Sequence, residues 1–431
     1  MSNSILIKDV RLLGAAADSH VDILVEGGVI TGITATGEDP TGQEPTVETV
    51  IAGNGRLALP GLVNAHNHIG MTILRSYSDD LPLWQWLREK MWPVEDRLTE
   101  EDVYIASLVA IAEMLRGGTT TFADMYFHMQ GVAKAVEESG IRAVLSRGLQ
   151  GLSGTGTAGL REAEALVTEY GGHDRITVML GPHSPVTCPP EFLREVVKLS
   201  ERLEVPIQTH LAETQTEVEE IARDYQLTPL EYLDKWGVLD RGLMAIHSVH
   251  LSPSDIALMQ EYEVTVVHCP TSNLKLGSGI APVPQLQAAG ITVGLGTDGP
   301  ASNNDLDMWE EMRLAALIHK GVNLDPLLVP AETAWQMATV DSARALGLTD
   351  IGELKVGCKA DVILVDIQQP HWTPQLDLTG NLVYSGKAAD VSLVMVNGQV
   401  VLEDGEVLLF DETEAMSRLQ RRAEELGLTK G

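Results

Sequence analysis

Between about Leu57 and Gly347 the chain alternates short apolar runs, typical of buried strands, with longer stretches that have helical character. Examples are "PEFLREVVKLSERLE" followed by "VPIQTHLAE", and "PVPQLQAAG" followed by "ITVGLGTDG". Repeated β-then-α units favour a parallel sheet and place the chain in the α/β class. Over this length they predict a (β/α)8 TIM-type barrel, with a doubly wound sheet as the alternative.

The two ends of the chain show a different pattern, made of short strand-like runs separated by turn signals. Gly27-Gly28 interrupts "VDILVEGGVITGI", and Asn397-Gly398 interrupts "VSLVMVNGQVVLEDGEVL"; both pairs favour tight hairpins. We therefore predict one small β-sandwich domain composed of residues 1–57 and 351–431, and a barrel over residues 58–350. The final "DETEAMSRLQRRAEELGL" predicts an exposed amphipathic helix.

Composition narrows the classes of ligand and compartment. The 61 acidic residues against 30 basic ones, a formal charge of −31, repel nucleic acid and anionic membrane surfaces, so a small neutral or zwitterionic ligand fits better. The start "MSNSILIKDV" lacks a basic segment followed by an apolar one, and we expect a cytoplasmic protein. The sequence leaves open whether the chain forms a homo-oligomer and whether its acidity reflects a high-salt environment.

Two histidines follow an apolar run in "LPGLVNAHNHIGM". Alternate residues of a strand point to the same side, so His66 and His68 can direct their rings at one point beyond the strand end. A pair of this kind suits a metal ion, but it is also common as a hydrogen-bonded polar pair. Other residues of the chain are needed to distinguish a metal site from a hydrogen-bonded pair.

Further polar side chains follow other strand-like runs. His210 and Glu213 end "VPIQTHLAE", His247 follows "GLMAI", His268 ends "VTVVH", and Asp298 follows "ITVGLGT". Each is unremarkable by itself, because strand-end residues of these types often bond to backbone groups. Together they occupy the positions that a barrel uses for chemistry, and imidazoles with one carboxylate predict a divalent metal site.

The strings "PGLVNAHNH", "HLAET", "HSVHL", "NLKLGSGIAP" and "GTDGPASNN" resemble the amidohydrolase superfamily, specifically its 5-methylthioadenosine/S-adenosylhomocysteine deaminase branch, over nearly the whole chain. The resemblance implies a metal-dependent hydrolytic deaminase that acts on a small purine nucleoside. Such an enzyme converts the 6-amino group of adenosine-type nucleosides to 6-oxo and releases ammonia. The metal ligands it implies are His66, His68, His210 and Asp298.

The resemblance also bears on the number of metal ions. Binuclear relatives use a carbamylated lysine at the end of the fourth strand, whereas the corresponding run "ITVMLGPHSP" has no lysine. One divalent ion per chain is therefore expected, with zinc as the expected metal. The other major fold of zinc deaminase uses a C-x-x-C motif, and the three cysteines form none.

Glu213 and His247 are the catalytic partners that the resemblance implies, together with Asp298. Glu213 would give a proton to the purine ring nitrogen, although a carboxylate at a helix start also has a plain structural reading. His247 would hold the attacking water by a hydrogen bond. Asp298 would take the proton of this water and relay it to the departing amine.

The resemblance further implies a set of substrate contacts. Glu95 would accept hydrogen bonds from ribose hydroxyls, or else be a surface partner of Arg97. The other contacts are Trp86, with Trp84 as the alternative stacking residue, His183, Glu213, and Arg147 and Arg161 at the 5′ substituent. Each arginine also has a plain surface interpretation, which is stronger for Arg161 because it lies on an apparent helix.

Two other functions stay open on the sequence. One is a relative in the same superfamily that acts on guanine-like or triazine rings, including hydrolytic dechlorination. The other is a metal-free structural relative of the dihydropyrimidinase-like assembly proteins. The intact ligand set argues against a metal-free protein, and Glu95 with the two arginines argues for a ribosyl substrate.

Overall fold

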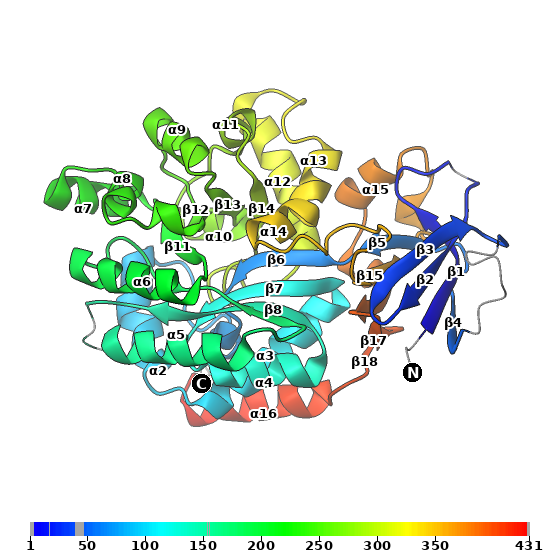
Figure 1. The fold of residues 1–431 in the computed structure, drawn as a ribbon, viewed down its shortest axis with the longest axis horizontal. Helices are drawn as coiled ribbons and strands as arrows, with labels where there is room; N and C mark the ends of the chain where they lie inside the picture. Colours follow the sequence, from blue (N-terminus) through cyan, green and yellow to red (C-terminus); the bar gives the residue numbers. More distant parts are fainter. Residues whose placement is uncertain (1–3, 17, 39–46, 153, 155, 429–431) are drawn as a thin grey trace.

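The computed structural model describes residues 4–16, 18–38, 47–152, 154 and 156–428. A large α/β body lies beside a smaller body built mainly of strands from both chain ends (Figure 1). No helix within the described ranges is long and apolar enough to cross a membrane.

The large body contains parallel strands that alternate with helices along the chain. Its strands are β6 (Leu62–Asn67), β7 (Thr119–Tyr126), β8 (Arg142–Leu149), β9 (Ile176–Val178), β10 (Gly181–Pro182), β11 (Ile207–Leu211), β12 (Leu243–His247), β13 (Thr265–His268) and β14 (Val293–Leu295). They form two parallel sheets, one joining β6 to β10 and one running β11-β12-β13-β14. β9 and β10 both pair with β8 and together take the fourth strand position.

The two sheets meet on both sides. A parallel bridge between Leu180 and Ile207 joins the first sheet to the second. On the other side the backbone N–H of Asp298 donates to the carbonyl oxygen of His66 at 3.0 Å. The parallel strands therefore close into the predicted (β/α)8 barrel, and the doubly wound alternative is wrong.

The helices of this body cover the strands and supply the connections between them (Figure 1). The longer helices are α3 (Glu100–Arg116), α4 (Met129–Ser139), α5 (Gly156–Tyr170), α6 (Pro190–Leu203), α7 (Gln215–Tyr225), α9 (Pro253–Glu261) and α12 (Met308–Asn323). The shorter ones are α1 (Leu83–Trp86), α2 (Trp92–Glu95), α8 (Pro229–Lys235), α10 (Pro270–Lys275), α11 (Val283–Ala288), α13 (Ala331–Met337) and α14 (Val340–Ala345). A further short helix, α15 (Leu378–Tyr384), belongs to the C-terminal part of the chain and contacts α12 and α13.

The smaller body is one nine-stranded sheet formed by both chain ends. Its strands are β1 (Ser4–Leu12), β2 (Val21–Glu26), β3 (Val29–Ala35), β4 (Thr49–Ala52), β5 (Leu57–Pro60), β15 (Val362–Val365), β16 (Val391–Val396), β17 (Gln399–Glu403) and β18 (Glu406–Val407). β5 pairs with both β1 and β15, so it joins the N-terminal strands to the C-terminal ones.

The nine-stranded sheet folds over a core of its own. Ile7 and Val25 pack there with Leu364 and Met395, which come from the other end of the chain. β5 extends to Pro60, beyond the domain boundary expected at residue 57. The division of the chain into residues 1–57 with 351–431 and residues 58–350 stays a prediction.

Both predicted hairpins are present. Gly27 and Gly28 connect β2 to β3 with φ angles of 58° and 82°, and Asn397 and Gly398 connect β16 to β17 with 50° and 74°. Left-handed values at both central residues match the turn type that suits the twist of a two-strand ribbon. In each case the residue types specified the turn.

The C-terminal helix α16 (Glu412–Glu425) is amphipathic, as predicted, and it packs against α3 rather than standing free (Figure 1). Ala415 and Leu419 on its inner face are buried. Arg422 donates from Nε and Nη2 to the two carboxylate oxygens of Asp102 on α3, at 2.6 and 3.2 Å. The helix therefore covers part of the barrel's outer layer.

Candidate active site

Strand ends of the barrel bring the predicted polar residues together. His66 and His68 come from the end of β6, His210 from β11, and Asp298 from the loop after β14. Asp298 has a φ of 62°, a left-handed conformation that is uncommon for residues other than glycine. His247 at the end of β12, with a φ of 68°, shares this conformation. Backbone conformations of this kind cluster at functional sites, where the surrounding structure holds them.

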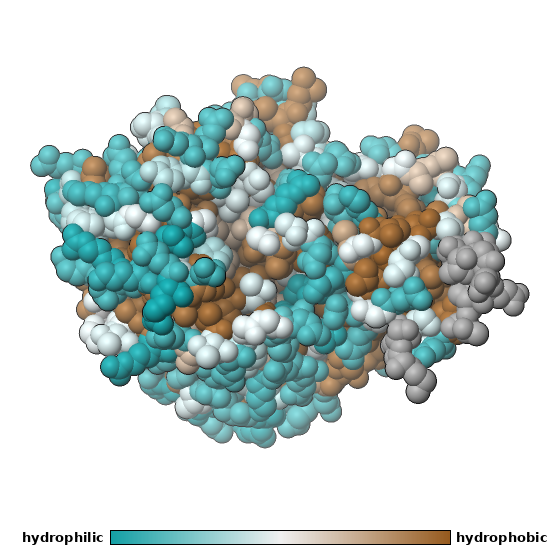
Figure 2. All heavy atoms as spheres, viewed as in Figure 1, coloured by the Kyte–Doolittle hydropathy of each residue, from teal (hydrophilic) through white to brown (hydrophobic). Residues whose placement is uncertain are grey.

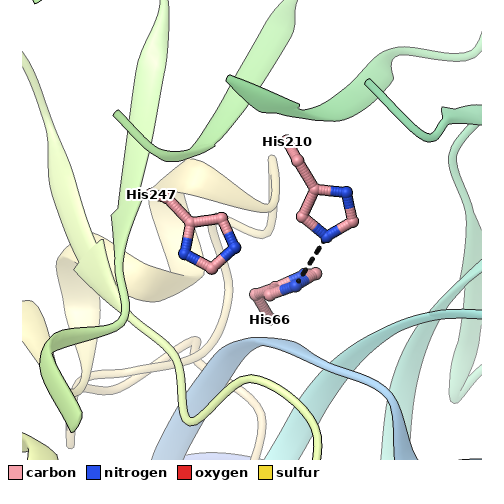
Figure 3. A group of neighbouring side chains, drawn as sticks. All are labelled: His66, His210 and His247. Carbon is pink, nitrogen blue, oxygen red and sulfur yellow. Dashed lines mark hydrogen bonds between the residues drawn. The ribbon is translucent and has the colours of Figure 1, made fainter. Parts of the chain in front are cut away.

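The candidate ligand atoms surround one point. His66 Nε2 lies 3.3 Å from His210 Nε2, and Asp298 Oδ1 lies 3.5 Å from His66 Nε2 and 3.3 Å from His68 Nε2. The ring of His247 approaches from β12, and Figure 3 shows it facing His66 and His210. The structure thus brings all four predicted ligands into one cluster.

Backbone groups orient two of these rings. His68 Nδ1 lies 2.5 Å from the carbonyl oxygen of Met125, and His210 Nδ1 lies 2.7 Å from that of His183. A carbonyl oxygen only accepts, so each Nδ1 carries the hydrogen and donates it. The lone pair of a neutral ring then lies on Nε2, which is the atom directed into the cluster.

Asp298 is oriented by two hydroxyl groups. Ser272 and Ser302 donate from Oγ to its Oδ2, at 2.6 and 2.8 Å. Its other oxygen, Oδ1, faces the histidines. Two hydroxyl donors on one oxygen leave the other oxygen free for a cation.

The charge states of the cluster suit a divalent metal ion. Burial lowers the pKa of His66 to about 3 and that of His210 well below its usual value, so both rings are neutral at neutral pH. Burial also acts to lower the pKa of His68, but the hydrogen bond and charge of Asp298 raise it to about 9. At neutral pH the cluster therefore holds a proton on His68 next to Asp298, and a metal ion bound there would replace this proton. Once that proton has left, three neutral imidazoles and one carboxylate are a donor set that binds zinc, and these four residues fit such an ion.

Glu213 and His247 lie beside the cluster. Glu213 Oε2 is 3.7 Å from His247 Nε2, while His247 Nδ1 is 2.9 Å from Asn273 Oδ1. Both side chains are buried, and burial raises the pKa of Glu213 above its usual value. A carboxyl group with a raised pKa can hold a proton near neutral pH and release it to a bound ligand.

A pocket opens next to these groups and is walled largely by aromatic side chains. Its lining includes Trp84, Trp86, Trp92, Tyr126 and Phe127 on the apolar side, and His183, Glu213, Glu217 and His247 on the polar side. Both tryptophans that the sequence offered as stacking residues face it. An apolar pocket with a few convergent polar groups is the usual form of a small-molecule site.

Glu95 also lines the pocket, and it is only 8% exposed. It accepts a hydrogen bond from the Tyr126 hydroxyl at 2.7 Å, and burial raises its pKa to about 7. Arg97 instead donates to the carbonyl oxygen of Leu426 at 3.1 Å. The alternative interpretation of Glu95 as a surface partner of Arg97 is therefore wrong.

The two arginines expected at the 5′ substituent are placed differently. Arg147 stacks on the Phe127 ring, 4.8 Å from its centroid, and its Nε donates to Glu162 Oε2 at 2.6 Å. It lies behind the pocket wall and does not line the pocket. Arg161 is exposed on α5 and also lies outside the lining, because the helix buries the face that carries Ala163 and Leu166. The structure therefore gives Arg161 no contact with the pocket.

His183, expected as a substrate contact, follows β10 directly and lines the pocket. His250 does not line the pocket, and its Nε2 donates to the carbonyl oxygen of Ser278 at 2.8 Å. His268 is buried next to His319, with ring centroids 5.3 Å apart, and is not part of the lining. Of the strand-end residues grouped in the sequence, His268 therefore stays outside the pocket.

Sequence reasoning missed Tyr126, Asn273 and Glu217. Tyr126 and Asn273 carry no local signal of their contacts with Glu95 and His247. Glu217 has one, since Thr214 followed three residues later by glutamate is the pattern of a capped helix start. That pattern indicates a role at the helix end, but not a place in the pocket.

Comparison with known proteins agrees with this geometry. Residues 57–401 match the model of the amidohydrolase family, and the barrel with its histidine and aspartate cluster is that of a metal-dependent amidohydrolase. A 5-methylthioadenosine/S-adenosylhomocysteine deaminase from Pelotomaculum thermopropionicum is 53% identical over 375 residues, which are 86% of this chain and 87% of the relative. The chain belongs to the 5-methylthioadenosine/S-adenosylhomocysteine deaminase family.

Two solved structures bear on metal and substrate. A zinc-bound adenosine deaminase from Xanthomonas campestris is 33% identical, with a TM-score of 0.93 over 99% of this chain and 98% of that one. A zinc complex of an atrazine chlorohydrolase from Arthrobacter aurescens TC1 is 26% identical, with a TM-score of 0.87 over 98% and 99%. The triazine enzyme shares the fold but is the more distant in sequence.

Proposed function

We propose that this chain is a zinc-dependent deaminase that hydrolyses the 6-amino group of 5-methylthioadenosine, S-adenosylhomocysteine and adenosine. The observation that carries the proposal is the placement of Glu213 and His247 between the candidate metal ligands and an aromatic pocket that contains Glu95. The names of the relatives support the same substrates. The products are the 6-oxo purine and ammonia.

His66, His68, His210 and Asp298 would hold one divalent ion. When bound, such an ion lowers the pKa of a coordinated water from 15.7 toward about 7 and so supplies a nucleophile at neutral pH. The zinc in the adenosine deaminase neighbour supports the choice of metal.

Three side chains then move or hold protons. Glu213 gives a proton to the ring nitrogen next to the carbon that bears the amine, which makes that carbon electrophilic. His247, whose Nδ1 is held by Asn273, directs Nε2 at the attacking water. Asp298 takes one proton from this water through Oδ1, because Oδ2 is occupied by two serine hydroxyls, and passes it to the departing amine. The second proton of the water goes to Glu213 when the 6-oxo group forms, which replaces the proton that Glu213 gave to the ring nitrogen.

The pocket would bind the nucleoside through stacking and through the sugar. Trp86 and the neighbouring aromatic side chains offer faces to the base. Glu95 would accept hydrogen bonds from the ribose hydroxyls, and His183 would make a further polar contact. For Arg147 to meet a carboxylate on the 5′ substituent, it would have to leave Glu162. A cytoplasmic location stays a prediction of the sequence, which leaves the oligomeric state open.

An ammonia-release assay across adenosine, 5-methylthioadenosine, S-adenosylhomocysteine, 5′-deoxyadenosine, guanine and a chlorotriazine tests the proposal. We expect turnover of the adenosine-type nucleosides and little of guanine or the triazine. A preference for guanine, or chloride release from the triazine, would contradict it.

The proton donor is tested by Glu213→Gln, which keeps the shape of the side chain but cannot deliver a proton. We expect kcat to fall by about 10²–10⁴-fold while bound metal, measured by elemental analysis, stays at the parent level. Turnover within a few-fold of the parent would remove Glu213 from this role.

A further inference from the structure

Glu217 is a buried glutamate to which the proposed reaction assigns no role. It is 4% exposed, it lines the pocket, and it lies on the first turn of α7. Each of its oxygens accepts one backbone hydrogen bond: Oε1 from the N–H of Ala212 at 2.9 Å, and Oε2 from the N–H of Glu213 at 3.0 Å. One side chain thus holds two consecutive peptide groups, the second belonging to the proposed proton donor.

This arrangement differs from an ordinary helix cap. Thr214 caps α7, because its Oγ1 accepts from the N–H of Glu217 at 3.2 Å. In a capping box the glutamate at this position returns to the N–H of the capping residue itself. Here it reaches past Thr214 to the two residues before it. The carboxylate therefore ties the start of α7 to the end of β11.

The same peptide unit is held from the opposite side. The carbonyl oxygen of Ala212 accepts hydrogen bonds from the N–H groups of Val249 and His250, at 3.1 and 2.9 Å. These donors belong to the loop that follows His247. Ala212 has a φ of 47°, a left-handed conformation that an alanine keeps only where several contacts impose it.

We propose that Glu217 is a positioning residue for proton transfer. Its carboxylate fixes the backbone of Ala212 and Glu213 so that the Glu213 carboxyl group stays beside His247, at the present 3.7 Å between Oε2 and Nε2. The inference rests on the proposed function, because it assumes that Glu213 transfers the proton. It assigns Glu217 no contact with the reacting atoms.

Glu217→Gln tests the need for two acceptor oxygens, because the amide keeps the volume but turns an N–H₂ donor toward a backbone N–H. We expect kcat to fall by about 10–100-fold, the range seen when supporting hydrogen-bond partners are removed. KM should stay within about twofold, and bound zinc should stay at the parent level. A kcat within about threefold of the parent, or a rise in KM with kcat unchanged, would overturn the proposal.

Two further variants act as controls. Glu219→Gln changes an exposed carboxylate on the same helix, whose contact is with Gln215 at 3.2 Å, and should behave as the parent. Glu217→Asp keeps a carboxyl group but is one methylene too short to reach both N–H groups. It should lose activity as well. Full activity in Glu217→Asp would contradict a positioning role.

A double-mutant cycle with Glu213→Gln separates positioning from general structural damage. If Glu217 acts through Glu213, adding Glu217→Gln to Glu213→Gln should cost less than about twofold more in kcat. If Glu217→Gln lowers kcat in the Glu213→Gln protein by the same factor as in the parent, the proposal is overturned. If the proposed function is wrong, the parent protein will prefer a substrate with another ring in the ammonia-release assay. The double-mutant cycle is then measured with that substrate.

Discussion

Three of the clustered histidines have a partner for the ring nitrogen that points away from the cluster. His68 and His210 contact carbonyl oxygens, and His247 contacts Asn273. His66 differs, since its Nδ1 is buried without a partner in the part of the chain that the structure describes. Three rings are thus oriented by hydrogen bonds, whereas packing and the cluster itself hold His66.

At the scale of the single residue, Glu95 offers the sharpest test of the substrate class. Beyond its hydrogen bond from Tyr126, Glu95 can accept hydrogen bonds from ribose hydroxyls only when the sugar is present, and hydrogen bonds to charged groups contribute about 1.5–3 kcal/mol each. We expect Glu95→Ala to lower kcat/KM for adenosine by about 10²-fold or more and to leave that for free adenine almost unchanged. Both substrates should be measured on both proteins.

The matched control is Asp96→Asn, which removes the exposed carboxylate next to Glu95 and should leave the adenosine-to-adenine ratio at the parent value. An unchanged ratio in Glu95→Ala would instead remove Glu95 from the substrate site.

At the scale of the element, single residues connect helices that lie far apart in the sequence. Thr99 caps α3, and Asp102 completes this capping box, because its carboxylate accepts from the N–H and the hydroxyl of Thr99, both at 2.8 Å. The same carboxylate pairs with Arg422 on α16. Burial acts to raise the pKa of Asp102, but Arg422 and Thr99 outweigh it and hold this pKa below its usual value.

The lowered pKa predicts how the docking of α16 depends on pH. A carboxylate with a depressed pKa stabilises the folded state above its unfolded pKa, and this contribution is lost as the pH falls through the lower folded value. Arg422→Gln should therefore lower the Tm at pH 7. Because the pair is partly exposed, we expect a loss of about 1 kcal/mol or less. The difference from the parent should shrink below about pH 4.

Arg421→Gln is the control, since Arg421 is the exposed neighbour on the same helix. Thermal unfolding of the three proteins across pH measures the effect. A Tm difference that stays constant down to low pH would contradict an ionic contribution from this pair.

At the scale of the whole molecule, chain segments that are distant in sequence share one small buried cluster. His66, His210 and Asp298 span more than half of the chain, and the strands that carry them belong to both halves of the barrel. The outer surface is mostly hydrophilic in the view of Figure 2, in keeping with the formal charge of −31. A bound cation would therefore join the two halves of the barrel in a strongly acidic protein.

Removal of the metal should lower the stability of the whole fold. A ligand at 1,000 times its Kd stabilises the native state by about 4 kcal/mol, which for a chain of this size corresponds to about 4–5 °C in Tm. We expect a chelator to lower the Tm by about this amount and added zinc to restore it. His66→Ala should show the lower Tm without chelator and little response to zinc. Equal Tm values with and without chelator would contradict the metal site.

The amino-acid sequence by itself determined the elements and the chemical types at their ends. The β-then-α alternation predicted the barrel, and the glycine and asparagine pairs predicted the hairpins, because these signals are local and depend on periodicity and backbone conformation. The histidines and Asp298 could be grouped in advance because parallel strands all end at one face of a barrel.

Only the tertiary structure decided which side chains of neighbouring elements meet. Arg161 lies in the same sequence region as Arg147, yet α5 turns it to solvent, and Arg147 is engaged by Glu162. Glu217 reads as a helix cap in the sequence, but the fold directs its carboxylate to Ala212 and Glu213. Such contacts depend on how helices pack on the barrel. Because the free energy of packing is shared among many residues, no local sequence pattern predicts these contacts.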